Sequence, residues 1–329
     1  LHQSLYNLPY MFLAAVIIAL GFIGLIWGAN KFVFGASALA RNLGVSPLMI
    51  GLTIVAFGTS APEVFSSAIA ALEDKPELAI GSALGSNLFN VGIALGVAAM
   101  ISPLKPPESL ASKELPALLL VTIVTGILLI DLHLGTFDAA VLIGIAGYLG
   151  YRLYRQSSHS GKAPETEDLK LIEINSIQAF AYLILGLVLL ILSAEALVQA
   201  ASSIAENLHV SAAIIGLTIV ALGTSLPELA ASVTFVLKGH DDLAIGNIIG
   251  SNILNLLVVL PFPGLLSPSS VDPFLLYRDY VGVLILTLLL SYICYRGIKK
   301  QKMIGRVHGA IFLLIYCCWF TVMLFQTQS

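Results

Sequence analysis

The chain has 329 residues, of which 58% are hydrophobic and only 11% are charged. Its mean hydropathy of +0.95 excludes an ordinary water-soluble domain and favours a protein that lies within a lipid bilayer. The small formal net charge of −3 gives no indication of a nucleic-acid partner. Nothing in the composition points to an obligatory protein partner either.

Ten apolar stretches follow one another along the chain, separated by short polar segments. A helix needs about 17–25 apolar residues to cross the hydrocarbon of a bilayer. The pattern therefore predicts an all-α membrane protein with ten spans, at residues 9–40, 45–73, 77–101, 114–131, 136–155, 176–205, 210–238, 242–266, 275–296 and 306–325.

The chain is expected to divide into two five-helix halves, residues 1–155 and 176–329, joined by a polar linker at 156–175. If the connections alternate between the two sides of the membrane, all but two of the 16 Lys and Arg residues fall on one side. The exceptions are Lys75 and Arg278. Because positive charge gathers on the cytoplasmic side, this asymmetry places the linker in the cytoplasm and both termini outside.

Residues 51–90 and 216–255 are two copies of one sequence. Without a gap, 21 of the 40 positions are identical at a constant offset of 165, and the matches include Gly, Thr, Ser, Pro, Glu and Asn. The copies are separated by five spans, and an odd number inverts the second copy relative to the first. Inverted repeats with a site near the membrane midplane are typical of secondary transporters.

Each copy contains one acidic residue in the middle of a span, Glu63 in the first and Glu228 in the second. A charged side chain at this depth costs roughly 2.5–3.5 kcal/mol on insertion scales, so it indicates a function. Pro62 and Pro227 precede the two glutamates, and a proline inside a helix removes one backbone hydrogen bond. We expect each helix to be broken there, with the two carboxylates facing one another.

The broken segments should be rich in oxygen atoms. The prolines release the carbonyls of Gly58 and Gly223, and hydroxyls lie immediately beside them. The following span of each copy carries a serine and an asparagine four residues apart, on one helix face. These residues predict a cation site; the side chains involved, besides the two glutamates, are Thr59, Ser60, Thr224, Ser225, Ser86, Asn90, Ser251 and Asn255.

Calcium is the cation that this set of oxygens suits best, because Ca²⁺ takes 6–8 oxygen ligands. A zinc or copper site is disfavoured, since no Cys or His lies near the two motifs. Two carboxylates balance one Ca²⁺ or two Na⁺, whereas an empty site would carry two uncompensated charges through a low-dielectric interior. The pattern therefore favours exchange of one cation for another, with no cofactor.

The segments GTSAPE with GSNLFN, and GTSLPE with GSNILN, resemble the two α-repeats of the calcium/cation antiporter superfamily. The ten-span layout and the segment LPFPGLLSPSSVDPFLLYRDY are most similar to the YrbG-type bacterial calcium/sodium antiporters. The resemblance implies a sodium/calcium exchanger fold, a bacterial inner membrane and cation ligation by the residues named above. It also implies carbonyl ligands at Ala56 and Ala221, and a sliding first and sixth span that would involve Lys31 and Glu195.

Three alternatives remain open. A carboxylate in a membrane can carry a proton, so Ca²⁺/H⁺ exchange is the nearest rival. A broken helix is also compatible with a passive cation channel. An intramembrane serine hydrolase using Ser60 or Ser225 is disfavoured, because such chemistry needs a base beside the nucleophile and no histidine adjoins either motif. Asn255, where some relatives in the superfamily carry Asp, argues against K⁺ co-transport and leaves the ratio of Na⁺ to Ca²⁺ open.

Overall fold

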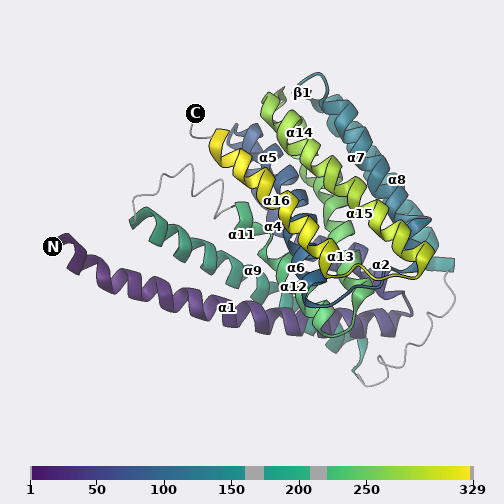
Figure 1. Ribbon diagram of the computed structural model, residues 1–329, viewed down its shortest axis with the longest axis horizontal. Helices are drawn as coiled ribbons and strands as arrows, with labels where there is room; N and C mark the ends of the chain where they lie inside the picture. The colour runs from purple at the N-terminus through teal and green to yellow at the C-terminus, as the bar shows by residue number, and fades with distance from the viewer. Residues whose placement is uncertain (1, 160–173, 208–220, 327–329) are drawn as a thin grey trace.

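The computed structural model describes residues 2–159, 174–207 and 221–326, and these residues are almost entirely helical (Figure 1). The first half contains α1 (His2–Leu43), α2 (Pro47–Ile50), η1 (Gly51–Val55), α3 (Ala56–Thr59), α4 (Ala61–Leu72), α5 (Pro76–Phe89), η2 (Asn90–Leu95), α6 (Gly96–Ile101), η3 (Glu108–Ala111), α7 (Glu114–Leu129), β1 (His133–Leu134) and α8 (Thr136–His159). The second half contains α9 (Ser176–Asn207), α11 (Ala221–Thr224), α12 (Leu226–Leu237), α13 (Asp241–Leu254), η6 (Asn255–Val259), α14 (Pro261–Leu266), β2 (Ser269–Ser270), η7 (Leu275–Tyr280), α15 (Val281–Lys300) and α16 (Arg306–Gln326).

The helices agree with the all-α, ten-span prediction. Within the described residues, seven helices are long and apolar enough to cross a membrane, and the bent pair α2–α4 makes an eighth. The remaining two expected spans correspond to α8 and to α11–α12, although the expected start of the latter at 210 lies outside the described residues. Two short strands, β1 and β2, pair antiparallel in loops.

The second span is broken where the sequence predicted it. Its two parts meet at Ser60 with a bend of 45°, because Pro62 cannot donate the backbone hydrogen bond that would continue the helix. Ser60 has φ −83° and ψ 6°, and its counterpart Ser225 has φ −92° and ψ 6°. The same local conformation therefore separates α3 from α4 and α11 from α12.

The third and eighth spans each contain a π-helical turn that the sequence did not predict. The turn begins at Asn90 in η2 and at Asn255 in η6, which are equivalent repeat positions. Such turns widen the helix by one residue and are common at functional sites. Here they begin at the two asparagines expected to face the cation.

Glycines let the two repeats approach closely. A Cβ atom added to Gly250 of α13 would lie 2.6 Å from the Leu52 carbonyl oxygen, and one on Gly51 would lie 2.8 Å from the Leu243 carbonyl oxygen. The Gly246-to-Gly250 spacing therefore allows α13 to pack closely against η1.

The first and sixth spans, α1 and α9, form an extensive helix pair that lies oblique to the rest of the bundle (Figure 1). Their backbones are in close contact, since a Cβ atom on Gly186 would lie 2.2 Å from the Phe32 nitrogen and 2.7 Å from the Gly28 carbonyl oxygen. Substitution of these glycines would separate the two helices.

The segments that connect the spans contact one another in two groups, one at each end of the bundle. At one end of the bundle, Leu104 and Ile304 form a β-bridge and the Lys105 N–H donates to Asp241 at 2.9 Å. At the other end, Ser267 donates to Asp74 at 3.3 Å and β1 pairs with β2. If ten successive spans alternate in direction, the first set of loops lies on one side of the membrane and the second set on the other, as these contacts have it. Figure 1 also places the start of α1 and the end of α16 toward one end of the molecule and the end of α8 at the opposite end.

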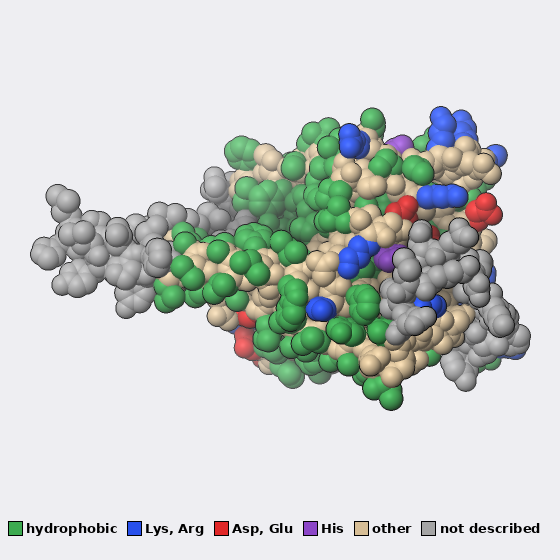
Figure 2. Space-filling view, turned by 90° about the horizontal axis from the view of Figure 1, so that it is seen from below, with side chains coloured by type: hydrophobic (Ala, Val, Ile, Leu, Met, Phe, Trp, Pro, Cys, Tyr) green, Lys and Arg blue, Asp and Glu red, His purple; other side chains and the backbone are tan. Residues whose placement is uncertain are grey.

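The surface of the bundle is apolar, as a lipid-facing protein requires. Many large hydrophobic side chains are exposed, among them Phe65 at 69% and Phe137 at 75%. Figure 2 shows hydrophobic side chains spread over one face, with Lys and Arg gathered in the half away from the N-terminus. One end of the bundle is therefore more basic than the other on this face.

The two groups of loops predict opposite labelling of introduced cysteines. In a background without Cys294, Cys317 and Cys318, we expect Gln301→Cys to react only with reagents that reach the cytoplasm and Asp272→Cys to react from outside. Impermeant maleimide labelling of intact cells, before and after permeabilisation, measures the difference. Reaction of both cysteines from the same side would contradict the ten-span arrangement.

Candidate cation site

The two glutamates lie at the start of the second half of each broken helix. Glu63 is the third residue of α4 and Glu228 is the third residue of α12, and both side chains are completely buried. The helix N-terminus places partial positive charge beside each carboxylate. The two glutamates therefore occupy equivalent positions in the two repeats, each at the N-terminal end of a helix segment.

The serines at the helix breaks connect the two repeats. Ser60 and Ser225 occupy N-cap positions but make no capping bond with their own helices. Instead, the Ser60 hydroxyl donates to Glu228 Oε1 at 2.9 Å and the Ser225 hydroxyl donates to Glu63 Oε1 at 2.8 Å. An N-cap is ordinarily worth about 1 kcal/mol to a helix. The hydroxyls thus act on the carboxylate of the opposite repeat rather than on the local helix.

The following helices add a second layer of polar atoms. Ser86 Oγ of α5 lies 3.4 Å from Glu63 Oε1 and 3.0 Å from Ser225 Oγ, so Ser86 belongs to the cluster around the glutamates. Ser251 of α13, at the equivalent repeat position, is fully buried.

Two further asparagines, which the sequence analysis did not single out, hold the predicted pair in place. Asn90 donates through Nδ2 to Asn252 Oδ1, and Asn255 donates through Nδ2 to Asn87 Oδ1, each at 3.1 Å. These reciprocal bonds use the amide nitrogens and leave the Oδ1 atoms of Asn90 and Asn255 free to accept. The signal was present in the sequence, because the Asn of GSN is identical in both copies.

Several buried oxygen atoms at the site have no hydrogen-bond partner among the described residues. Most buried polar atoms in proteins are paired, and an unpaired one generally costs about 1–3 kcal/mol. The atoms come in repeat-related pairs with one addition: Glu63 Oε2, Glu228 Oε2, Asn90 Oδ1, Asn255 Oδ1 and Ser251 Oγ. They are acceptors gathered from both repeats, which is the arrangement that a hard cation requires.

The other predicted ligands lie next to this cluster. Thr59 is buried at the end of α3, and its hydroxyl contacts Asn247 Oδ1 at 3.1 Å and the Val55 carbonyl at 3.2 Å. The Ala56 carbonyl accepts from the Ser60 N–H at 3.0 Å. In the second copy, Thr224 and Ala221 form the two ends of α11, and the side chain of Ala221 lies outside the described residues.

Lys31 and Glu195 are not part of the cluster. Glu195 is exposed on α9 and accepts a hydrogen bond from Gln199 at 2.7 Å, one turn along the same helix. The Lys31 ammonium lies over the rings of Trp27 and Tyr182. In the described part of the chain, no three His, Cys, Asp or Glu side chains gather in one place.

The model of the sodium/calcium exchanger protein family matches residues 13–154 and 178–325. The chain is 40% identical to CaxA of Alkalimonas amylolytica, with 93% of this chain and 97% of that protein covered. It is 36% identical to the inner membrane protein YrbG of Escherichia coli, with 95% and 97% covered.

The solved structures of the sodium-calcium exchanger NCX_Mj, including one soaked with Na⁺ and Ca²⁺, match 94% of this chain and 98% of that chain, at 32% identity and a TM-score of 0.80. A match of this extent includes both repeats, so the helices that carry the glutamates, serines and asparagines all have counterparts in that fold.

Neutralising either glutamate should weaken cation binding. We expect Glu63→Gln and Glu228→Gln each to lower the affinity for Ca²⁺ at least about tenfold, or about 1.4 kcal/mol, because each removes one of two buried negative charges. Glu195→Gln is the matched control, since it neutralises a membrane carboxylate outside the cluster. Calorimetric titration of the purified protein compares the three; equal affinities would rule out the assignment of the two glutamates.

Proposed function

This chain belongs to the sodium/calcium exchanger protein family, and we propose that it is a secondary active antiporter that exchanges Ca²⁺ for Na⁺ by alternating access at the buried cluster. Membership of a transporter family argues against the hydrolase alternative.

One observation carries the proposal: each repeat contributes one buried carboxylate and one buried amide oxygen without a hydrogen-bond partner among the described residues. Ca²⁺ requires 6–8 oxygens, and carboxylates, hydroxyls and carbonyls of the cluster are available to supply them. We assign cation ligation to Glu63, Glu228, Thr59, Ser60, Thr224, Ser225, Ser86, Asn90, Ser251 and Asn255, and to the carbonyls of Ala56 and Ala221.

The charge of the cluster supports exchange over free passage. Two ionised carboxylates balance one Ca²⁺ or two Na⁺, whereas the empty protein would have to rearrange around two uncompensated charges in a medium of low dielectric constant. This cost disfavours switching without ions. The burial of both glutamates also favours a closed binding site over the open, water-filled pore of a channel.

Sodium is the counter-ion that the comparisons favour. The sodium/calcium exchanger MaX1 of Methanosarcina acetivorans is 31% identical over 94% of this chain, and NCX_Mj is also named a sodium-calcium exchanger. Protons are the second candidate, because the same two carboxylates could each carry one.

We further propose a bacterial inner-membrane location, with two five-helix halves at residues 1–155 and 176–329, a cytoplasmic linker at 156–175 and both termini outside. YrbG is named an inner membrane protein. The contacts between connecting segments gather the loops at two ends of the bundle, as alternation of the spans across the membrane would place them. The helix α8 continues to His159, so the first four residues of this linker, 156–159, are helical.

Transport measurements in proteoliposomes distinguish Na⁺ from H⁺ as the counter-ion. Uptake of radioactive calcium should be driven by an outward Na⁺ gradient and should not be driven by a pH gradient of equal free energy. Uptake driven only by the pH gradient would replace Na⁺ by H⁺ in the proposal. Calcium flux without any counter-ion would instead identify a channel.

A third carboxylate at the site should change its ion dependence. Asn255→Asp leaves one negative charge that Ca²⁺ does not balance, so the site should take up a proton or a monovalent cation together with Ca²⁺. We expect calcium uptake by this variant to become dependent on pH near neutrality or on K⁺. Asn90→Asp, at the equivalent repeat position, should behave alike. Profiles that superimpose on those of the parent protein would show that Asn255 does not face the ions.

A further inference from the structure

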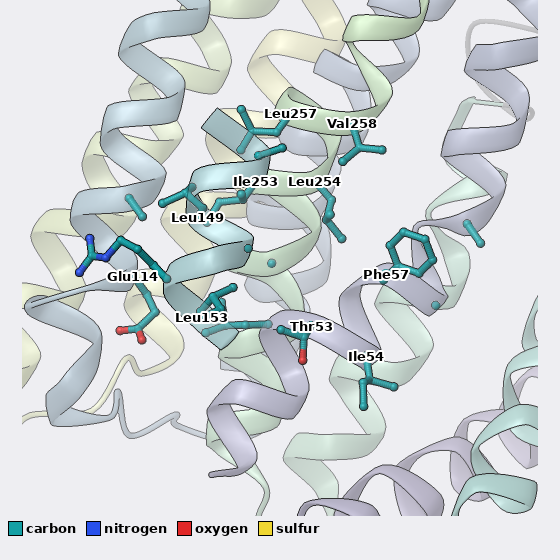
Figure 3. A pocket seen from close by; sticks show the side chains of 18 of the residues that line it. Thr53, Ile54, Phe57, Glu114, Leu149, Leu153, Ile253, Leu254, Leu257 and Val258 are labelled. Carbon is teal, nitrogen blue, oxygen red and sulfur yellow. The ribbon is translucent and has the colours of Figure 1, made fainter. Parts of the chain in front are cut away.

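A large pocket lies beside the cation site and is not used by the proposed transport mechanism. Its volume is about 680 Å³, within the range of roughly 300–1,000 Å³ that is usual for pockets that hold small molecules. Figure 3 shows its walls converging from several helices: Phe57 from α3, Leu149 and Leu153 from α8, and Leu257 from η6. Leu187 of α9 completes the lining on the remaining side.

The apolar part of the pocket opens toward the bilayer. Phe57 and Phe180, which border it, are 58% and 54% exposed on the outer surface of the bundle. Apolar cavities of this kind are not stable water sites, because water needs polar partners. In a membrane, the molecules that meet such an opening are acyl chains. The pocket therefore fits a hydrocarbon chain entering from the lipid.

One end of the pocket is charged. Lys113 and Glu114, at the start of α7, and Arg152, near the end of α8, line it there. By the positive-inside argument, this end faces the cytoplasmic leaflet, at the level of the lipid head groups. Among the described residues, none of the three charged side chains forms an ion pair.

Glu114 is the most unusual of the three residues. Only 5% of the surface of Glu114 is exposed, and its Oε2 atom has no hydrogen-bond partner among the described residues. Figure 3 shows its carboxylate at the edge of the pocket, on the side away from Phe57. The first turn of α7 favours a negative charge there, but this effect does not supply a donor for Oε2. A positively charged donor is the complement that this carboxylate lacks.

We propose that the pocket binds one molecule of phosphatidylethanolamine. The acyl chain occupies the apolar part, Lys113 and Arg152 hold the phosphate, and Glu114 accepts hydrogen bonds from the primary ammonium group. Basic residues between membrane helices recognise phosphate head groups, and charge-assisted hydrogen bonds are the strong ones. A purely anionic lipid would place its phosphate near Glu114 with no cation of its own to offset the repulsion.

The position of the pocket connects it with the transport site. Gly58 lines it two residues before Ser60, and Gly250 lines it immediately before Ser251. The lipid would therefore contact the segments that carry cation ligands on one side and α9 on the other. The lipid site itself does not depend on which ions are exchanged.

Head-group recognition can be measured by native mass spectrometry of the detergent-purified protein. We expect dioleoyl phosphatidylethanolamine to bind at least about tenfold more tightly than dioleoyl phosphatidylcholine, which has the same chains and phosphate but no N–H donors. Glu114→Gln should remove this preference. Joint replacement of Lys113 and Arg152 by Gln should weaken the binding of both lipids.

Two glycines of α8 give a matched test of the apolar part. A side chain at Gly150 would enter open space and Gly150 lines the pocket, whereas Gly147 also faces open space but does not line it. Gly150→Phe should abolish lipid binding and Gly147→Phe should preserve it. Any of three results would overturn the proposal. These are equal affinity for phosphatidylethanolamine and phosphatidylcholine, tighter binding of phosphatidylglycerol than of phosphatidylethanolamine, and unchanged lipid binding by Gly150→Phe.

Discussion

The cost of placing two carboxylates in the interior of a membrane protein determines the architecture of this molecule. Glu63 and Glu228 are both fully buried. Each helix is broken at the serine two residues before the proline that precedes its glutamate, which brings a helix N-terminus to the carboxylate. The hydroxyl of the serine at each break does not cap its own helix but donates a hydrogen bond to the glutamate of the opposite repeat. This pair of buried carboxylates is the basis of the proposed cation site.

Because the two repeats stabilise each other's carboxylates, neither repeat forms a complete site alone. The hydrogen bonds of Asn90 with Asn252 and of Asn255 with Asn87 follow the same reciprocal pattern. Close packing of η1 on α13 through Gly51 and Gly250 makes these contacts possible. In the proposed exchange, the two repeats would keep this polar interface, and α1 and α9 form a separate helix pair oblique to it (Figure 1).

Much of this arrangement could be predicted because the sequence contains the same motif in two copies. The duplicated motifs identified Glu63 and Glu228, and the prolines predicted the breaks, since these are local effects of residue type. The π-helical turns at Asn90 and Asn255, the orienting amides of Asn87 and Asn252, and the pocket next to Glu114 were not predicted. They depend on how distant helices pack, and a single sequence does not give side-chain packing.

The most direct test of the account is the position of bound calcium, determined by anomalous X-ray scattering from crystals of the protein with Ca²⁺. The account predicts one strong calcium peak located between the two repeats, about 2.3–2.6 Å from at least one carboxylate oxygen of each of Glu63 and Glu228. A peak that contacts only one of the two glutamates, or a calcium site remote from both, would contradict it.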